Sequence, residues 1–435
     1  MKEVKLMILM LLAVAGSISA KDYYIAPNGS DNAAGTIEAP FATLNKIQER
    51  LRPGDKVYFR GGVYKVKPAQ VMRTINNYSV VFFLGRNGTA DAPISYLAYP
   101  GDRERPVFDF SDIRPKDLRV SAFWLKGSYL HLKGFDIVGV QVTETKHTQS
   151  EGISGRGGSN NVIENVAVHD GMSIGFYFTR GNDNLLLNCD AYNNYDSVSE
   201  GGKGGNSDGF GFHFSRADYK GNRAVDCRAW MNSDDGFDFI GCKSPVELDH
   251  CWALYSGWKD DKVKTPGDGN GFKCGGYGRK GQKEDFTAPT HYIHNCIAVR
   301  NKSYGFYANH HLAGNRWVNN SAMLNKGNYN MVNQKVWNEG VDVPGYSHVL
   351  TRNISYRSSR GDAGDTLNIN VKRCTLADNE FALGKDNPFV STDFKQLMAP
   401  RKADGTLPDI TFMRIKDHNS ALYKKSVGYE FDVKK

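Results

Sequence analysis

The sequence predicts an all-β protein with the fold of a right-handed parallel β-helix, and three observations support this. Helical periodicity is scarce, short apolar runs are broken by Asn, Asp and Gly, and one short motif recurs along the chain. The motif has a polar residue, a small residue, an Ala within two positions, usually an Asn or Asp, and in most copies a later Gly-Phe. Irregularly spaced repeats that form short strands without helices are typical of a β-solenoid, whose crossovers are usually right-handed. The copies begin at Glu164, Leu187, Val225, Asp249, His294 and Asn319.

Residues 1–20 have the pattern of a secretory signal peptide. A lysine-containing start precedes an apolar run from Leu6 to Ala15, and small residues lead to a predicted cleavage site after Ala20. Later apolar runs are too short to cross a membrane as a helix. We therefore expect a secreted or periplasmic protein, a monomer, in which residues 21–435 form a single β-helix domain.

The N-terminal end of the solenoid needs a cover, because a terminal coil would otherwise expose its core and its strand edges. The segment Pro40–Leu51 places Leu44, Ile47 and Leu51 on one face of a helix. The sequence therefore predicts a short amphipathic capping helix over Pro40–Leu51.

Equivalent residues of successive coils should stack about 4.8 Å apart, at the spacing of neighbouring strands. The chain has seven cysteines without C-x-x-C spacing, so we expect buried free thiols rather than a zinc site. The repeat predicts an interior column of small residues and a ladder of asparagines at a turn. The column comprises Cys189, Cys227, Cys251, Cys296 and then Ser321, and the ladder comprises Asn193 or Asn194, Asn232, Asn301 and Asn325.

The chain is basic, with a formal charge of +8 that becomes +7 without the two lysines and one glutamate of residues 1–20. An excess of positive charge favours an acidic partner, such as a polyuronate, nucleic acid or a membrane surface. The same excess is also ordinary for a soluble protein surface, so charge alone leaves the choice open.

The stretch NSDDGFDF at 232–239 concentrates three aspartates, and the repeat register adds a fourth. Asp208 and Asp235 precede Gly-Phe pairs in neighbouring coils, so they should stack, with Asp234 and Asp238 nearby. A single such aspartate is most simply a turn cap, but four converging carboxylates repel one another without a cation. Calcium takes six to eight oxygen ligands, whereas Mg²⁺ needs a tighter octahedron and zinc prefers His or Cys. The sequence therefore predicts a calcium site.

Lys273, in the stretch GNGFKCGG, should lie one coil beyond Asp238. The simplest interpretation is a salt bridge to Asp238. A lysine can also act as a base if its pKa of about 10.4 is lowered by burial and a nearby cation, although Asp238 would raise it. Such a base could remove the C5 proton of a uronate whose carboxylate is neutralised by the cation, and the 4-O substituent would then leave by β-elimination.

The stretches NSDGFGF, NSDDGFDF and GNGFKCGG occur in this order, between an opening at 22–65 and a tail at 399–417. Together they resemble polysaccharide lyase family 9, which contains pectate lyases and rhamnogalacturonan lyases. The resemblance covers nearly the whole of residues 21–435. It implies a substrate among acidic plant cell-wall polysaccharides, homogalacturonan or rhamnogalacturonan I, and does not fix a general acid. It implies Ca²⁺ ligands at Asp208, Asp234, Asp235 and Asp238, with Lys273 as the base.

Substrate contacts are expected from loops and coil edges near the predicted groove. The inserted loops Asp196–Gly209 and Trp258–Gly271 could close one end of it, and Tyr307 could stack on a sugar ring. At least one cation should meet the substrate carboxylates. The candidate contacts are Lys203, Lys243, Lys262, Arg279, Tyr307, His310 and His311.

Three other functions fit parts of this pattern. A β-helix hydrolase of the polygalacturonase type would use paired carboxylates, but its Gly-His-Gly motif is absent and it has no need of Lys273. A non-catalytic carbohydrate-binding solenoid could use calcium purely as a structural ion. A lyase acting on another polyuronate, such as alginate or a glycosaminoglycan, would share the chemistry and differ in its groove.

Overall fold

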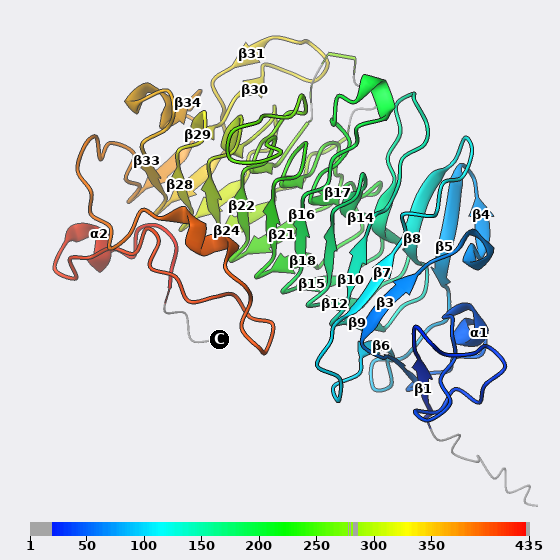
Figure 1. The fold of residues 1–435 in the computed structure, drawn as a ribbon. Coiled ribbons are helices and arrows are strands. Elements are labelled where there is room, and N and C mark those ends of the chain that lie inside the picture. Colours follow the sequence, from blue (N-terminus) through cyan, green and yellow to red (C-terminus); the bar gives the residue numbers. More distant parts are fainter. Residues whose placement is uncertain (1–19, 277, 279, 282–285, 432–435) are drawn as a thin grey trace, which may run out of the picture.

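The structure, a computed structural model, describes residues 20–276, 278, 280, 281 and 286–431. The predicted signal peptide lies outside the described residues except for Ala20, and so does Arg279. The described chain is almost entirely β-structure, wound into a right-handed parallel β-helix (Figure 1). The predicted fold class is confirmed. Within the described residues, no helix has the length and apolar character needed to cross a bilayer.

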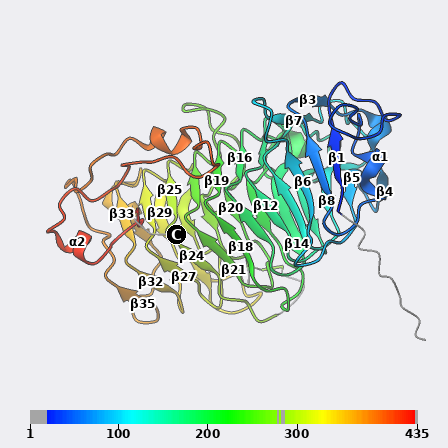
Figure 2. The ribbon, with the colours of Figure 1, turned by 90° about the horizontal axis from the view of Figure 1, so that it is seen from below.

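Three long sheets run along the axis of the β-helix, and each coil between the two ends contributes to all three (Figures 1 and 2). The first, called sheet A, has twelve strands among the described residues, all paired in parallel. In order along the sheet they are β1 (Asp22–Ile25), β2 (Lys56–Phe59), β6 (Ile94–Ala98), β9 (Leu130–Lys133), β12 (Val162–Glu164), β15 (Leu185–Leu187), β18 (Asn222–Val225), β21 (Val246–Asp249), β24 (Tyr292–His294), β27 (Arg316–Val318), β32 (Val349–Thr351) and β35 (Thr375–Ala377).

Sheet B follows sheet A in each coil, after a tight turn, and is also parallel throughout its described strands. It carries the motif that revealed the repeat. Its strands are β3 (Gly62–Lys65), β7 (Pro106–Asp109), β10 (Asp136–Val138), β13 (Ala167–His169), β16 (Asp190–Tyr192), β19 (Arg228–Trp230), β22 (Trp252–Leu254), β25 (Ile297–Val299), β28 (Ser321–Met323) and β33 (Ile354–Tyr356).

Sheet C contains the Gly-Phe segments and follows sheet B after loops of variable length. Its pairing is parallel except at the N-terminal edge, where β4 is antiparallel to β5. Its strands are β4 (Arg73–Ile75), β5 (Tyr78–Leu84), β8 (Arg119–Leu125), β11 (Glu151–Arg156), β14 (Ile174–Arg180), β17 (Phe210–Phe212), β20 (Phe237–Asp238), β23 (Phe272–Lys273), β26 (Tyr304–Tyr307), β29 (Gly327–Asn330) and β34 (Thr366–Leu367). Outside the three sheets, β30 (Asn333–Gln334) pairs with β31 (Asp342–Val343).

Helices are short and peripheral. The α-helices of the described chain are α1 (Asn45–Gln48) and α2 (Ala421–Lys424), and single 3₁₀ turns occur at Pro68–Gln70, Ser199–Gly201, Asp362–Gly364 and Phe394–Met398.

The predicted capping helix is present but shorter than expected. The sequence predicted Pro40–Leu51, whereas α1 spans Asn45–Gln48, because Phe41 is still extended and forms a parallel bridge with Ile25. Leu44, Ile47 and Leu51 are buried in the core as the apolar spacing required. The segment lies at the N-terminal end of the β-helix, beside β1 and β5 (Figure 1).

The turn after sheet B shows which asparagine forms the predicted ladder. Asn193 has a positive φ of 54°, a conformation that Asn tolerates better than most residues, and it makes the corner itself. Asn194 is the ladder residue, since its Oδ1 accepts the N–H of Gly171 at 3.2 Å. The other predicted members are Asn232, Asn301 and Asn325, with N–H···Oδ1 distances of 3.4 Å for Asn194 to Asn232 and 3.0 Å for Asn301 to Asn325. Ser256 takes this position in the coil between Asn232 and Asn301, and its N–H donates to the Oδ1 of Asn301 at 3.0 Å.

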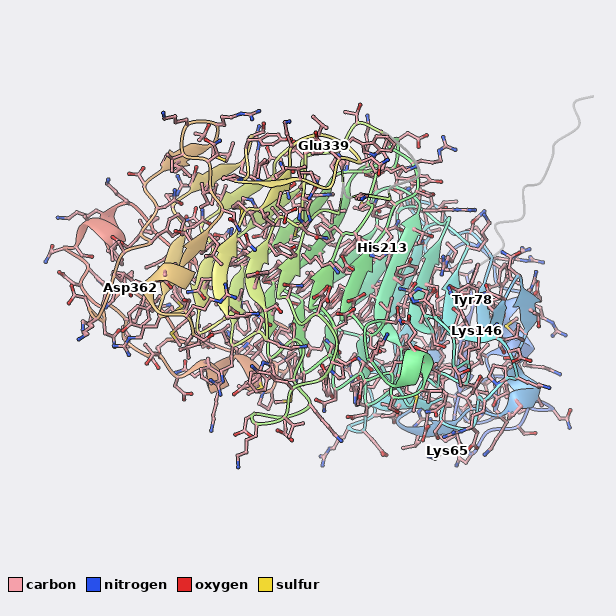
Figure 3. The ribbon with its side chains drawn as sticks, turned by 90° about the horizontal axis from the view of Figure 1, so that it is seen from above. Lys65, Tyr78, Lys146, His213, Glu339 and Asp362 are labelled. Atoms are coloured by element: carbon pink, nitrogen blue, oxygen red, sulfur yellow. The ribbon has the colours of Figure 1, made fainter. Side chains whose placement is uncertain are left out.

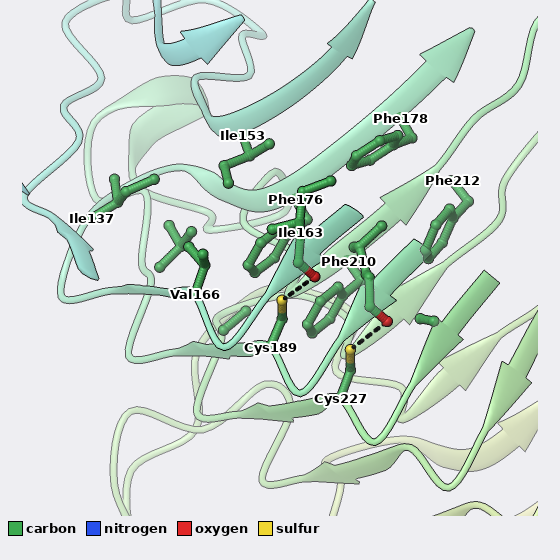
Figure 4. Close-up of a cluster of buried hydrophobic side chains, with 14 of the residues drawn as sticks. Ile137, Ile153, Ile163, Val166, Phe176, Phe178, Cys189, Phe210, Phe212 and Cys227 are labelled. Carbon is green, nitrogen blue, oxygen red and sulfur yellow. Dashed lines mark hydrogen bonds between the residues drawn. The ribbon is translucent and has the colours of Figure 1, made fainter. Parts of the chain in front are cut away.

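The cysteine column is confirmed over its first four members. Their thiols are free and buried, and the Sγ of Cys189 donates to the carbonyl of Ile163 in the preceding coil at 3.3 Å (Figure 4). The expected continuation at Ser321 is wrong, because Ser321 pairs with Ile297 and lies one position farther along. Asn320 takes the column position instead, and its Oδ1 accepts the N–H of Cys296 at 2.9 Å.

The Gly-Phe pairs build the core beneath sheet C. The rings of Phe176, Phe210, Phe237, Phe272 and Phe306 stack with centroids 4.7–4.9 Å apart. Figure 4 shows the first two of them. The glycine before each ring is required by close approach. A Cβ on Gly236 would lie 2.7 Å from the carbonyl oxygen of Gly271, in the next coil. The tight glycine and the buried ring together hold the residue before each pair in a fixed place.

The described part of the tail, residues 383–431, packs against the outside of sheet B. Apolar side chains from the tail, including Leu397 and Phe412, form a buried cluster with outward residues of sheet B such as Trp252 and Ile297. In Figure 1 this orange-to-red segment runs back along coils that precede it in the sequence. The tail therefore covers the outside of sheet B over strands β16–β33.

Candidate active site

The candidate site lies on the outer face of sheet C, where the register brings four residues into one row. Gly211 pairs with Asp238, Asp238 with Lys273, and Lys273 with Tyr307 across strands β17, β20, β23 and β26. This is the column expected for the residue after each Gly-Phe pair. Two-residue strands suffice here because the stacked rings and glycines beneath them fix the position of each coil.

The residue before each Gly-Phe pair forms a second row, held by the backbone of the next coil. The Oδ1 of Asp208 accepts the N–H of Asp235 at 3.1 Å, and the Oδ1 of Asp235 accepts the N–H of Asn270 at 2.6 Å. Each carboxylate therefore has one oxygen fixed by the main chain. The other oxygen of Asp235 meets the Nζ of Lys273 at 2.9 Å, so the two rows face the same side, as predicted.

Three of the predicted metal ligands converge. Asp208, Asp234 and Asp235 are buried and each offers a carboxylate oxygen within 4.8 Å of the others, a geometry that could hold a metal ion. Asp238 stands at the side of this group. Its Oδ2 lies 3.5 Å from the Nζ of Lys273 and 3.8 Å from the Nε2 of His213.

The electrostatics of the four carboxyls differ because their neighbours differ. Burial, reinforced by the charges of the other aspartates, raises the pKa of Asp208 and Asp234 well above the ordinary value. Burial also raises the pKa of Asp235 to about 6, although Lys273 opposes it. At Asp238 the attraction of Lys273 and His213 outweighs burial and brings its pKa to about 2. The cluster of four carboxyls therefore has too little positive charge nearby to keep all of them ionised.

Lys273 is the cation that the described structure places among these acids, and its side chain is only 7% exposed. Burial lowers its pKa, but Asp235, Asp238, Asp234 and Asp268 together raise it well above the ordinary value. Without a metal ion, Lys273 is therefore an ammonium. The expected lowering of this pKa requires that the surrounding negative charge be neutralised.

Two residues beside this cluster were missed by the sequence analysis. His213 contacts Asp238, and its Nδ1 lies 3.1 Å from the hydroxyl of Tyr177. Alternation along β17 would have found it, because positions 211 and 213 share a face. Asp268 lies in the inserted loop before β23, where its Oδ2 is 3.4 Å from the Nζ of Lys273. No periodic signal points to Asp268.

A cavity of about 660 Å³ opens above the acids, and the inserted loops form its walls. One wall carries His147, Glu200 and Lys203, and another is the short run from Pro266 to Asp268. The Oε2 of Glu200 meets the Nδ1 of His147 at 3.2 Å, which ties two separate loops together on the first wall. Figure 3 shows His213 near the middle of the molecule, with Tyr78 toward the N-terminal end.

The other predicted substrate contacts fall in different places. Lys203 lines the cavity, and Tyr307 is the register neighbour of Lys273. The Nζ of Lys243 lies 4.9 Å from the ring centroid of Phe286, and the Nε2 of His310 lies 3.1 Å from an oxygen of Asp342. His311 is fully buried and donates to the carbonyl of Pro289, which makes it a structural residue. Lys262 is exposed on the Trp258–Gly271 loop, and Arg279 lies outside the described residues.

Residues 23–348 match the protein family described as "Pel9A-like, right handed beta helix region". The chain belongs to this family. It is a polysaccharide lyase, and the resemblance noted from its motifs is confirmed.

Similar proteins cover nearly the whole chain. It is 30% identical to "Pectate lyase L" of Dickeya dadantii over 94% of this chain and 87% of that protein. It is 27% identical to "Pectate lyase PEL9" of Emericella nidulans over 92% of this chain and 94% of that protein. Among solved structures, a "Rhamnogalacturonan lyase" shares 42% identity with a TM-score of 0.88, covering 94% of this chain and 99% of that one. The crystal structure of pectate lyase Pel9A shares 28% identity with a TM-score of 0.69, over 93% and 91% of the two chains.

Proposed function

We propose that this chain is a calcium-dependent lyase that cleaves a pectic acidic polysaccharide by β-elimination, with Lys273 as the base. The observation that carries the proposal is the imbalance of charge at the site. Three buried carboxylates lie within 4.8 Å of one another, a fourth stands beside them, and Lys273 is the cation among them. Buried charged groups in proteins are normally paired with an opposite charge or bind a metal ion. Carboxylates that line a cavity without enough positive charge beside them favour a bound cation.

Calcium fits this donor set. The ligands would be Asp208, Asp234, Asp235 and Asp238, all of them oxygen donors of the kind that Ca²⁺ prefers. The pKa of two of these carboxyls is raised well above its ordinary value, as expected for a site built to hold a cation. When bound, calcium supplies positive charge that neutralises the carboxylate of a uronate and stabilises the negative charge that develops there.

Lys273 has the position of a base beside that carboxylate. It removes the C5 proton, the electrons of the C5–H bond form the C4–C5 double bond, and the C4–O4 bond breaks. The proton remains on Nζ until it is passed to solvent, and the departing O4 takes a proton from water. Because neighbouring carboxylates hold the proton on Lys273 in the free protein, neutralisation of their charge is what makes Nζ available as a base.

For the substrate, we propose rhamnogalacturonan I ahead of homogalacturonan. The similarity to the rhamnogalacturonan lyase, 42% identity with a TM-score of 0.88, is greater than that to pectate lyase Pel9A, 28% and 0.69. The groove contacts would include Lys203 on the wall of the cavity and Tyr307 one coil beyond the base. We further propose that residues 1–20 are a signal peptide, and that residues 21–435 act outside the cytoplasm as one monomeric domain.

The experiment that tests this function is ultraviolet absorbance during incubation with each polymer, with Ca²⁺ or with a chelator. Elimination leaves an unsaturated uronide that absorbs, so we expect a calcium-dependent rise that is faster on rhamnogalacturonan I. New reducing ends without that rise would indicate hydrolysis and would remove the role of Lys273. A faster rise on polygalacturonate would reverse the order of substrates.

A further inference from the structure

Lys302 anchors the loop that forms one wall of the cavity, although it lies outside the cavity lining. It follows Asn301, a member of the asparagine ladder, so its backbone is fixed by the turn. Its Nζ donates to the carbonyl oxygens of Thr265 at 2.8 Å and Pro266 at 3.2 Å, and also to that of Gly267. An ammonium has three donors, and here each meets one carbonyl of three successive residues.

These three carbonyls point the same way because the loop is pressed against the coil below it. The Oγ1 of Thr265 donates to the carbonyl of Ser233 at 2.6 Å. A Cβ on Gly267 would lie 2.2 Å from that same carbonyl oxygen, so no other residue fits at this position. This packing brings the carbonyl oxygens of the loop close together on its other side, where the Lys302 ammonium satisfies them by hydrogen bonding.

The next residue of the loop reaches the proposed metal site. The N–H of Asp268 donates to the Oδ1 of Asp234 at 2.7 Å, while its carbonyl accepts from the Oγ of Ser303 at 2.6 Å. The Asp268 carboxylate meets the Nζ of Lys273 at 3.4 Å. One continuous set of contacts therefore joins Lys302 and Ser303 to a candidate ligand and to the candidate base.

We propose that Lys302 is a positioning residue that fixes the segment Thr265–Asp268, which includes the Pro266–Asp268 wall, and thereby orients Asp234 for the cation. The inference rests on the proposed calcium-dependent function. Without the Lys302 ammonium, three carbonyls must turn toward water, and the wall cannot do this while Asp268 keeps its hydrogen bond to Asp234. Outer groups that orient a metal ligand typically contribute about 10–100-fold in metal affinity or activity.

The test is calcium titration by calorimetry on Lys302→Met, which keeps the side-chain stem and removes the charge. We expect calcium affinity to fall roughly 10–100-fold, and Lys302→Arg to restore most of it because guanidinium also donates to several carbonyls. Activity should recover when calcium is raised, as expected for a positioning residue. Lys326→Met is the matched control, since Lys326 follows Asn325 at the equivalent turn one coil later and is exposed. This control should bind calcium like the wild type.

A second variant keeps the inference testable if Lys302→Met folds poorly. Ser303→Ala removes the contact to the Asp268 carbonyl alone and should weaken calcium binding a few-fold. Calcium affinity equal to wild type in Lys302→Met, or in Ser303→Ala if the first fails to fold, would overturn the inference and leave the proposed function intact. A wild-type protein that binds no calcium would overturn the proposed function instead.

Discussion

Buried aspartates on two faces of the same β-helix have pKa values shifted in opposite directions. On the outer face of sheet B, Asp190 lies under the C-terminal tail between two arginines. Arg228 donates to both of its oxygens at 2.9 and 2.7 Å, and Arg401 does so at 2.7 and 3.1 Å. Burial raises the pKa of Asp190, but the two guanidinium groups outweigh it and leave this pKa below its ordinary value.

On the outer face of sheet C, the aspartates of the candidate site share Lys273 as their cation within the described structure. The pKa of Asp208 and Asp234 is raised, opposite in direction to that of Asp190, although the burial is comparable. Asp190 is thus neutralised by two cations of the chain itself, whereas the aspartates on sheet C are not fully neutralised within the described structure. The proposed calcium ion would supply the positive charge that is missing on sheet C, and four predictions test this contrast.

The largest effect is expected from Lys273→Ala. Loss of a general base typically costs roughly 10²–10⁴-fold in rate, so the rise in absorbance on rhamnogalacturonan I should nearly vanish. Circular dichroism and calcium titration should show a folded protein that still binds the ion. Wild-type turnover in this variant would show that another group removes the proton.

Asp190→Asn should have its effect on stability instead. The change leaves two buried guanidinium groups without a counter-charge, which typically costs roughly 3–5 kcal/mol of unfolding free energy. Urea denaturation measures this loss, and calcium affinity and turnover of the folded protein should stay at wild-type values. A parallel fall in calcium affinity would mean that the two faces are coupled.

The pH dependence of stability without calcium should have opposite signs at the two sites. The folded-state pKa of Asp235 is raised to about 6, so the folded protein holds more protons than the unfolded chain between its ordinary pKa and 6. Its contribution is therefore lost as pH rises through 6, by roughly 2–3 kcal/mol at 1.36 kcal/mol per pKa unit. In chelator, the unfolding free energy of wild type minus that of Asp235→Asn should fall as the pH rises from about 4 to about 6 and then level off. A flat difference would show that Asp235 is already neutralised in the free protein.

The same logic makes Asp190 a source of acid sensitivity. Because its folded-state pKa is lowered, its contribution is present above the unfolded value and is lost as pH falls through the folded one. The Asp190→Asn variant should therefore lose less stability than wild type below pH 4, which serves as the internal control for the opposite trend at Asp235.

Asp208→Asn should have the smallest effect, and the sign of the change in unfolding free energy is the informative result. The amide keeps an oxygen for the N–H of Asp235 and removes one of the repelling charges. In chelator we expect the variant to be more stable than wild type by about 1 kcal/mol, in the range of gains obtained when a functional residue is removed. Calcium titration should show weaker binding, and destabilisation in chelator would contradict an excess of negative charge at the site.

The fold and the rows of the site could be predicted because a solenoid repeats its environment in every coil. Each Gly-Phe pair fixes the depth of its strand, so the residues before and after it, such as Asp235 and Asp238, fall into rows that can be read from the sequence. The rows predicted Lys273 beside Asp238, and its Nζ lies 3.5 Å from the Asp238 Oδ2, but the shorter contact of 2.9 Å is with Asp235 of the other row.

What could not be predicted lies where the repeat is interrupted or loosely defined. The rule of an Ala within two positions placed Ser321 in the cysteine column, whereas alignment on Ala298 and Ala322 places Asn320 there. Asp268 reaches the site through a loop whose path depends on packing against Ser233 rather than on any period. The partnership of Arg401 with Asp190 joins positions 211 residues apart and leaves no local pattern.

The distance in sequence between Arg401 and Asp190 also sets an order of events during synthesis. The coils that contain β16–β28 emerge long before the tail, so the apolar outside of sheet B has no cover until nearly the whole chain is available. Until then these coils expose an apolar surface that favours aggregation with other nascent chains. Expression of a chain that ends before Phe389 should therefore yield aggregates even though every strand of sheet B is complete. Only a fully synthesised chain has the tail that covers this apolar surface.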